Sequence, residues 1–508
     1  MIDEDRSGRK KILPNVITSW LSQFVFIAFG FILPRAIDDT IGQVSLGIWD
    51  FGWTIVSYLN VAMVGIGASV NRHVARYRAS GEGQKLSSSV SSVVAVQCCI
   101  GSGVFLVTVL LYFLTPSIMG EQLGERTGTA AFVVLFLGSS VAVQMVFDAF
   151  RGILTGCHRW TTHNVLNAGG YAVTATSMLL LLANGYGLEG MATAYLGVTV
   201  VVELLRFRIA RAACPEIELS LRHVNRTDIG MMVRFGIKNV LIYLPRLIIT
   251  QTISLFVILN LGAAMLAVLS RPLALVAHIS TLMNKFAFVL TPVAGSLQGS
   301  GQIDELKQLA INTVRIGWFF ALLPTTFLIV LGDRVIELWM GVEYINREII
   351  IILSAGAIFP VAQRTFVTIL IGMDEHGRIA KYSIAGSAIV VLIGLGLVHA
   401  YGWSLAAAAW LIVASTNIGI AAVTLIVGCR VLGISAVEYM RSILRDPILL
   451  CVILLSALYA VRIYGPQTAF ASFCVGAIVH ALVAGVVLRK ELYLVWENVR
   501  RKPVKAAN

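Results

Sequence analysis

Four basic residues interrupt long apolar stretches of this sequence: Arg246, Arg271, Lys285 and Arg364. A charge at the centre of a bilayer costs at least ~2.5 kcal/mol, so such a side chain normally faces a cavity or a partner. Arginine offers several donors in a planar fork that matches carboxylates and phosphates. The pattern indicates anion binding inside a membrane. A structural ion pair or a hydrogen bond between helices is the alternative for Arg246 and Arg271.

Three of the candidates share one spacing: Arg271, His278 and Lys285 recur every seven residues. In a helix this spacing keeps them on one face, with a drift of ~20° per step, and gives a cationic ladder about 21 Å long. Two alternatives stay open. Lys285 could extend its amine to the inner surface of the membrane, and His278 could be a neutral, hydrogen-bonded interior histidine.

The composition requires a membrane around these residues. Of 508 residues, 57% are hydrophobic and only 13% are charged, about half the charged share of soluble domains. Apolar runs long enough to cross a bilayer recur along the chain, and lipid-exposed backbone must satisfy its own hydrogen bonds. We therefore predict an all-α integral membrane protein with about fourteen transmembrane helices, at 15–36, 44–70, 91–114, 130–151, 164–183, 188–208, 236–259, 263–297, 311–331, 348–371, 382–399, 403–428, 447–463 and 468–488.

The net charge of +12 comes from basic residues in short connections between apolar runs. This is the positive-inside pattern of membrane proteins, so no nucleic-acid partner is expected, and both termini are predicted to be cytoplasmic. The cysteines show no CxxC spacing and predict neither a disulfide framework nor a metal site. No ATPase motif and no catalytic constellation occurs, so we expect a transporter without a cofactor.

An internal repeat divides the chain. Residues 186–198 match residues 401–413 at an offset of 215, with six of thirteen positions identical. Ile153–Gly156 matches Ile369–Gly372 at 216, and Gly83-Gln84 matches Gly301-Gln302 at 218. Six helices separate equivalent points, which predicts two lobes of parallel topology. The predicted parts are an N-lobe (1–210), a cytoplasmic linker (211–235), a C-lobe (236–430) and a C-terminal helix pair with a basic tail (431–508).

The repeat also pairs opposite charges. Asp148 corresponds to Arg364, and Asp50 falls within about one turn of the equivalent of Arg271. All four intramembrane basic residues fall in the C-lobe, so we predict ion pairs between the lobes that gate one side of a cavity. For Asp148 a local bond to Arg151 one turn later is the alternative. For Asp50 the alternative is a role in proton coupling.

Residues 46–86 resemble the polysaccharide-export, oligosaccharide-flippase family. The resemblance rests on Leu46-Gly-Ile-Trp-Asp-Phe-Gly-Trp53 and on Asn71-Arg-His-Val-Ala-Arg-Tyr-Arg78. The loops at Gly156 and Gly372 support it, and in outline it covers most of residues 10–430. It implies a transporter of the multidrug/oligosaccharidyl-lipid/polysaccharide superfamily that moves undecaprenyl-diphosphate-linked oligosaccharides between leaflets of the cytoplasmic membrane. It also implies that the 15–36, 44–70, 236–259 and 263–297 helices line the cavity.

The expected partners are the lipid-linked oligosaccharide and membrane lipid, and the polysaccharide polymerase machinery is a candidate partner. The basic ladder would give the diphosphate a series of partial partners during its passage. A peptidoglycan-precursor flippase and a multidrug or cation antiporter of the same fold are alternatives. A membrane polymerase or ligase for glycolipids is an alternative of another class, but it would be expected to have a larger outer loop than this sequence offers.

Overall fold

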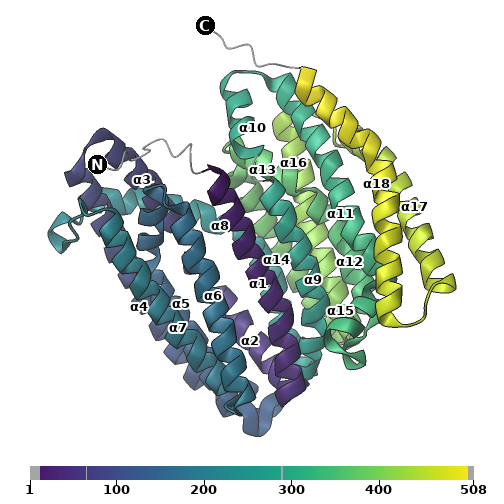
Figure 1. The fold of residues 1–508 in the computed structure, drawn as a ribbon, viewed down its shortest axis with the longest axis horizontal. Coiled ribbons are helices and arrows are strands. Elements are labelled where there is room, and N and C mark those ends of the chain that lie inside the picture. The colour runs from purple at the N-terminus through teal and green to yellow at the C-terminus, as the bar shows by residue number, and fades with distance from the viewer. Residues whose placement is uncertain (1–11, 64–65, 288–289, 502–508) are drawn as a thin grey trace. The chain divides into compact units, whose positions relative to one another are not determined.

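The computed structural model describes residues 12–63, 66–287 and 290–501, and in these ranges all regular structure is helical. The chain divides into two compact units, with the boundary between Ala267 and Val268. Each unit is a bundle of long helices (Figure 1).

The first unit contains eight α-helices joined by short turns. They are α1 (Ile12–Ile41), α2 (Gln43–Leu59), α3 (Ile66–Ser80), α4 (Gly83–Leu123), α5 (Thr127–Gly156), α6 (Trp160–Ala183), α7 (Gly187–Ala213) and α8 (Arg226–Leu261). Within this unit α5 packs against α4, α7 and α3, while α6 packs against α1 and α7. The four helices α4 to α7 thus share one packed interior.

The second unit begins within α9 and continues to the C-terminal helices. Its helices are α9 (Ala263–Ala287), α10 (Leu290–Gly299), α11 (Ile303–Met340), α12 (Arg347–Ala362), α13 (Arg364–Gly372), α14 (His376–Tyr401), α15 (Leu405–Thr416), α16 (Val423–Leu432), α17 (Ala436–Tyr464) and α18 (Ala469–Arg501). The helix α11 packs against α12, α17 and α18, and the last two run side by side along it (Figure 1).

The prediction of an all-α membrane protein is confirmed. Eleven described stretches are long and apolar enough to span a bilayer. One of them, 83–156, comprises both α4 and α5, while α2 and the apolar part of α18 (Ala469–Gly485) each fall one residue short of the length required. These helices bring the count close to the predicted fourteen.

Several predicted helices are interrupted in the structure. The predicted 44–70 helix becomes α2, a 3-10 turn over Asn60–Met63, and α3. The predicted 348–371 helix breaks at Gln363, three residues after Pro360, into α12 and α13. The predicted 403–428 helix contains a π-helical turn at Asn417–Ala422. Proline and π-turns free backbone groups locally, which is how these helices change direction without ending.

Two helices extend well beyond their predicted bounds. The 41 residues of α4 and the 38 residues of α11 correspond to lengths of about 61 Å and about 57 Å. A hydrocarbon core is only about 30 Å thick. Polar turns at the ends of these helices therefore continue the helix outside the apolar layer, where a hydropathy pattern cannot detect them.

The internal repeat is visible in backbone geometry. Gly42 and Gly262 precede α2 and α9, and both have positive φ, at 84° and 87°. In each turn the glycine N–H bonds the carbonyl four residues earlier at 3.0 Å, and its own carbonyl accepts a bond from the residue four positions later. Glycine adopts this conformation without a steric penalty. The offset between the two turns is 220 residues, obtained from 262 and 42.

The same comparison corrects the register of one predicted match. The structure aligns Gly81 with Gly301, whose φ values are 73° and 72°, rather than Gly83 with Gly301. In both turns the preceding serine hydroxyl contacts the side chain that follows the glycine: Ser80 Oγ lies 2.9 Å from Glu82 Oε1, and Ser300 Oγ lies 2.9 Å from Gln302 Oε1. The sequence match was two residues out because a Gly-Gln pair is short enough to align by coincidence.

The turns after α5 and α13 keep the predicted offset of 216. His158 and Asp374 occupy equivalent positions and have positive φ, at 56° and 61°. Each turn follows a closely packed glycine. A Cβ on Gly156 would lie 2.7 Å from a side-chain carbon of Val74, and one on Gly372 would lie 2.4 Å from the Thr291 carbonyl oxygen. In both units, therefore, the last residue of a helix is a glycine that packs closely against another helix, α3 in the first unit and α10 in the second.

The packing boundary lies later in the chain than the boundary expected from the repeat. The helix α8, assigned to the C-lobe from the sequence, packs against α2, α4 and α3 and belongs to the first compact unit. The connection before it is also shorter than the predicted 211–235, because α7 continues to Ala213 and α8 begins at Arg226. The Asn225 side chain caps α8 by accepting a bond from the Thr227 N–H at 2.9 Å.

Candidate functional site

Arg271 is the most deeply buried of the predicted basic site residues. It lies in α9 beside Pro272, and only 3% of its surface is exposed. Its guanidinium carbon lies 5.8 Å from the ring centroid of Trp339, in the last turn of α11. A cation over an aromatic face is stabilised by about 0.5–2 kcal/mol, depending on desolvation. The fold of the second unit thus provides an aromatic partner for this buried charge.

The seven-residue ladder lies on one continuous helix, since α9 includes Arg271, His278 and Lys285. Exposure increases along it: Arg271 is buried, His278 is partly buried and Lys285 is exposed. Seven residues correspond to about 10 Å of helix rise, so the ladder spans about 21 Å. The geometry places two basic side chains and one histidine at successive positions along one helix.

Arg364 begins α13, directly after the break at Gln363, and is partly buried. Its carbonyl oxygen accepts a 2.9 Å bond from the Thr368 hydroxyl. The break places this arginine at the start of a helix, where a cation is disfavoured by the helix dipole. A partly buried cation in such a position is stabilised more by an anionic group than by its own helix.

Arg246 lies in α8, in the first compact unit, and its side chain is exposed on that unit. It therefore does not share a unit with Arg271, Lys285 and Arg364. The sequence repeat assigns all four basic residues to the C-lobe, whereas packing joins α8 to α2 and α4 in the first compact unit.

The two acidic candidates differ in their surroundings. Asp50, in α2, is partly buried, and its carbonyl accepts a 3.0 Å bond from the Thr54 hydroxyl. It lies in the first unit, so its pairing with Arg271 stays a prediction. Asp148, in α5, is buried and forms an ion pair with Arg151 of the same helix. This is the local contact that the sequence offered as the alternative to gating.

Asp148 also bonds a neighbouring helix. The Gln97 side chain of α4 donates to Asp148 Oδ2 at 3.3 Å and accepts from the Ala149 N–H at 2.9 Å. The aspartate is thereby held between α4 and α5 in the interior of the first unit. The ion pair with Arg151 and the hydrogen bond from Gln97 compensate the cost of burying this carboxylate.

The first unit contains a second charged pair that was not predicted from the sequence. Glu203 and Arg206, both in α7 and both buried, form a two-pronged ion pair, with Arg206 Nη1 2.8 and 3.1 Å from the two Glu203 carboxylate oxygens. Arg206 Nη2 donates to Asn167 Oδ1 at 2.8 Å, and the Asn167 amide contacts His163 Nε2 at 3.0 Å. The polar contacts therefore extend from α7 to α6.

The two ion pairs lie close enough to interact electrostatically, since both Asp148 and Arg151 act on Glu203. We call Gln97, Asp148, Arg151, His163, Asn167, Glu203 and Arg206 the N-lobe polar network. It joins α4, α5, α6 and α7 and carries equal numbers of carboxylates and guanidinium groups. The spacing of Glu203 and Arg206, three residues apart inside an apolar run, was the signal that could have revealed it.

The comparisons with known proteins support the fold. No family model and no curated protein matches the sequence. Among solved structures, the lipid II flippase MurJ in an inward closed conformation aligns with a TM-score of 0.70 and 12% identity, over 94% of this chain and 99% of that chain. An inward-facing multidrug resistance MATE family transporter of the MOP superfamily aligns with a TM-score of 0.64 and 14% identity, over 84% of this chain and 99% of that chain.

A MOP superfamily transporter from Pyrococcus furiosus, described as having a binding pocket of reverse polarity, aligns with a TM-score of 0.61 and 16% identity. It covers 84% of this chain and is itself covered over 96% of its length. At such identities the likeness concerns architecture. The chain has the fold of the MOP superfamily transporters and flippases.

Proposed function

We propose that this protein is a flippase for oligosaccharides linked to undecaprenyl diphosphate, acting by alternating access in the cytoplasmic membrane. Both termini would be cytoplasmic, and the flipped lipid would supply surface polysaccharide synthesis, where the polymerase machinery would consume it. The observation that carries the proposal is the burial of Arg271 against Trp339. Arg271 is the first of the three residues spaced seven apart on α9.

The chemistry of a diphosphate head group fits the basic residues. Arg271, His278 and Lys285 offer hydrogen-bond donors of increasing exposure on α9. A phosphate that leaves water must replace its hydrogen bonds to water with protein donors along its whole path across the membrane. Arginine supplies several such donors in a fixed geometry. Arg364 and Arg246 would contribute further hydrogen-bond donors. When no substrate is bound, Asp50 would form an ion pair with Arg271. Asp148 has Arg151 as its partner, so we assign it no gating role.

The extent of the structural likeness also favours a flippase over an antiporter. The lipid II flippase aligns with 94% of this chain, whereas the MATE transporter aligns with 84%. A multidrug antiporter for organic cations would be expected to have a cavity dominated by carboxylates, because a desolvated cation requires negative partners. The lining expected here is dominated by arginine and lysine.

A lipid II flippase is the second candidate, because the alignment over 94% of the chain is with a protein of that activity. Both candidates would bind a diphosphate and differ in the glycan. Complementation of a strain depleted of its own lipid II flippase separates them. Growth would favour the second candidate, and accumulation of cytoplasmic lipid-linked repeat units on deletion of the gene would favour the first.

Direct transport can be measured in proteoliposomes. The probe is undecaprenyl diphosphate carrying a short, fluorescently labelled oligosaccharide, and dithionite bleaches only the label in the outer leaflet. We expect the protein to make the whole pool accessible, and Arg271→Gln to slow this at least about tenfold, equivalent to ~1.4 kcal/mol. Arg430→Gln, an exposed basic residue at the end of α16, is the matched control.

Two results would contradict the proposal. One is movement of labelled phosphatidylcholine as fast as the glycolipid, which would indicate unspecific scrambling. The other is an unchanged rate in Arg271→Gln when the variant is folded and reconstituted at equal density.

A further inference from the structure

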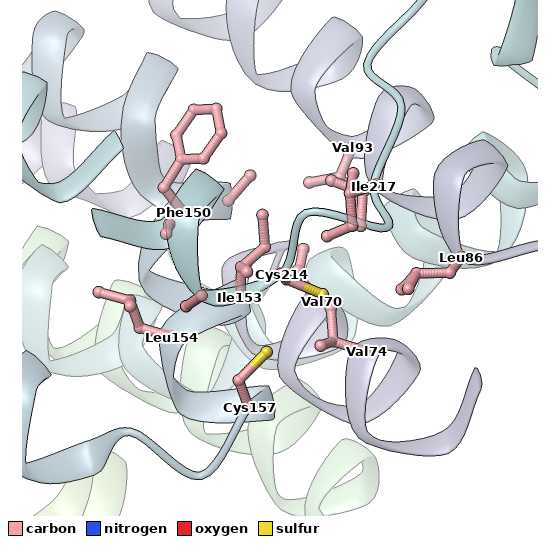
Figure 2. Close-up of a cluster of buried hydrophobic side chains, with 14 residues drawn as sticks. Val70, Val74, Leu86, Val93, Phe150, Ile153, Leu154, Cys157, Cys214 and Ile217 are labelled. Atoms are coloured by element: carbon pink, nitrogen blue, oxygen red, sulfur yellow. The ribbon is translucent and has the colours of Figure 1, made fainter. Parts of the chain in front are cut away.

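Two cysteines meet at one end of the first unit, outside the membrane-spanning segments. Cys157 directly follows α5 and Cys214 directly follows α7. Both are buried, with 7% and 1% of their surface exposed, in a cluster that includes Val70 and Val74 of α3 (Figure 2). Figure 2 shows both sulfur atoms within this cluster, and the two thiols interact with each other. The fold thus brings together two thiols that are 57 residues apart, counted from 157 to 214.

The surroundings make the two thiols unequal. The pKa of Cys157 is lowered, first by its contact with the Cys214 thiol and then by Arg78 and Arg159, which lie nearby. The same contact raises the pKa of Cys214, together with burial and the hydrogen bond to Glu216. Cys214 donates a hydrogen bond to Glu216 Oε2 and so retains its proton, which leaves Cys157 as the better nucleophile.

Polar contacts hold the pair in place. Cys214 Sγ lies 3.0 Å from Glu216 Oε2, and Arg78 Nε of α3 lies 3.5 Å from Glu216 Oε1. Glu216 thus links the thiol pair to α3. The other five cysteines, Cys98, Cys99, Cys429, Cys451 and Cys474, lie within the helices α4, α16, α17 and α18.

We propose that Cys157 and Cys214 form a peroxide-reactive dithiol that is converted reversibly into a disulfide joining the ends of α5 and α7. The reaction begins when the Cys157 thiolate attacks one oxygen of hydrogen peroxide. The O–O bond breaks, Cys157 becomes a sulfenic acid, and the hydroxide that leaves takes up a proton to give water.

The second step completes the exchange. The Cys214 sulfur attacks the sulfenic sulfur of Cys157, the S–S bond forms, and the displaced hydroxide takes up the Cys214 proton and leaves as a second water. Together the two sulfurs lose two electrons, which the peroxide accepts. A thiol reductant restores the two thiols. This reversibility suits a reducing compartment, where disulfides are transient.

The proposal is independent of the transported substrate. A covalent bond between residues 157 and 214 would join the end of α5 to the end of α7. These ends lie next to α3, whose Val74 packs on Gly156. The bond would enclose α6 and α7 in one covalent loop. Oxidation would thus join segments that the reduced protein holds by packing and hydrogen bonds.

The test uses the full-length protein purified in detergent. After treatment with hydrogen peroxide, free thiols are blocked and the protein is digested with trypsin without reduction. Cleavage after Arg151, Arg159, Arg211 and Arg222 releases residues 152–159 and 212–222. We expect a linked pair of these peptides that disappears on reduction. Cys98→Ser/Cys99→Ser should retain it, whereas Cys157→Ser and Cys214→Ser should each lack it.

Kinetics provide a second readout. Because the pKa of Cys157 is lowered, the oxidation rate should reach half its maximum at a pH below the ordinary value for a cysteine. Removing a nearby positive charge in Arg78→Gln should slow oxidation at neutral pH several-fold. The proposal is overturned if peroxide leaves folded wild-type protein without the linked peptides, or if Cys157 is oxidised to sulfinic acid without linkage to Cys214.

Discussion

The guanidinium of Arg462 donates to both carboxylate oxygens of Asp333, at 2.9 and 2.7 Å. Arg462 lies in the last turn of α17 and Asp333 lies in α11, so this pair joins the C-terminal helix pair to the rest of the second unit. Arg462 Nη1 also donates to the Val330 carbonyl. Apolar packing accompanies the pair, with Leu458 buried against Val330 and Leu331.

Replacing Asp333 with asparagine should loosen α17. The substitution removes the charge that compensates a partly buried arginine, and we expect a loss of about 2 kcal/mol in stability. Thermal unfolding in detergent, followed by size-exclusion chromatography, measures it. Glu337→Gln, which removes the partner of the more exposed Arg334 on the same helix, should cost less than about 1 kcal/mol. Equal shifts in the two variants would count against a special role for Arg462.

Within the N-lobe polar network, single and double substitutions should have different effects. Arg206→Met leaves Glu203 buried without its main partner, and we expect a loss of about 3–5 kcal/mol. Combining it with Glu203→Leu should recover most of the loss, because no uncompensated charge is left. Thermal unfolding of the four proteins provides the cycle. The exposed pair Arg35–Asp39 is the control, and Arg35→Gln should change stability by less than about 1 kcal/mol.

The closely packed glycine of the second unit allows a steric test. A Cβ at Gly372 would lie 2.4 Å from the backbone oxygen of Thr291, which cannot move as a side chain can. Gly372→Ala should therefore destabilise the protein by about 1–3 kcal/mol. Gly377→Ala, at a helical site with nothing within 4 Å of the added carbon, should be neutral or slightly stabilising. Similar melting temperatures for the two variants would contradict the close contact.

Trp339 offers a way to test the surroundings of Arg271 without removing the charge. Trp339→Leu keeps an apolar side chain but removes the aromatic face, 5.8 Å from the guanidinium. We expect a cost of about 1–2 kcal/mol and slower transport in the proteoliposome assay. Trp339→Phe, which keeps a ring, should lie between wild type and Trp339→Leu. A leucine variant with wild-type stability and transport would argue against the interaction.

The sequence predicts the helices and the repeat because both depend on local patterns. Apolar runs identify the spans, and positions such as Gly156 and Gly372 carry the repeat at a constant offset. Helix ends and breaks are less predictable. Pro360 precedes the break at Gln363, but Pro324 lies inside the unbroken α11, so a proline in the sequence does not by itself show where a helix breaks.

The charged interior of the first unit was harder to foresee. Glu203 and Arg206 lie within one helical turn and have opposite charges. Their charges cancel in a net-charge count along the 188–208 run, so such a count does not reveal them. The environment of Arg271 was also beyond the sequence, since Trp339 is 68 residues away, counted from 271 to 339. The site residues themselves could be chosen from the cost of a buried charge, but their partners depend on tertiary packing.

The connection between α7 and α8 has a consequence for biosynthesis. Ser87, Ser91 and Ser92 of α4 accept bonds from the backbone N–H groups of Glu218, Ser220 and Asn225, at 3.0, 3.3 and 2.9 Å. All of these partners are translated before α9 begins. The connection can therefore form its hydrogen bonds to α4 while the ribosome is still making the second half of the chain. The nascent protein then does not expose an unstructured loop near the membrane-insertion machinery.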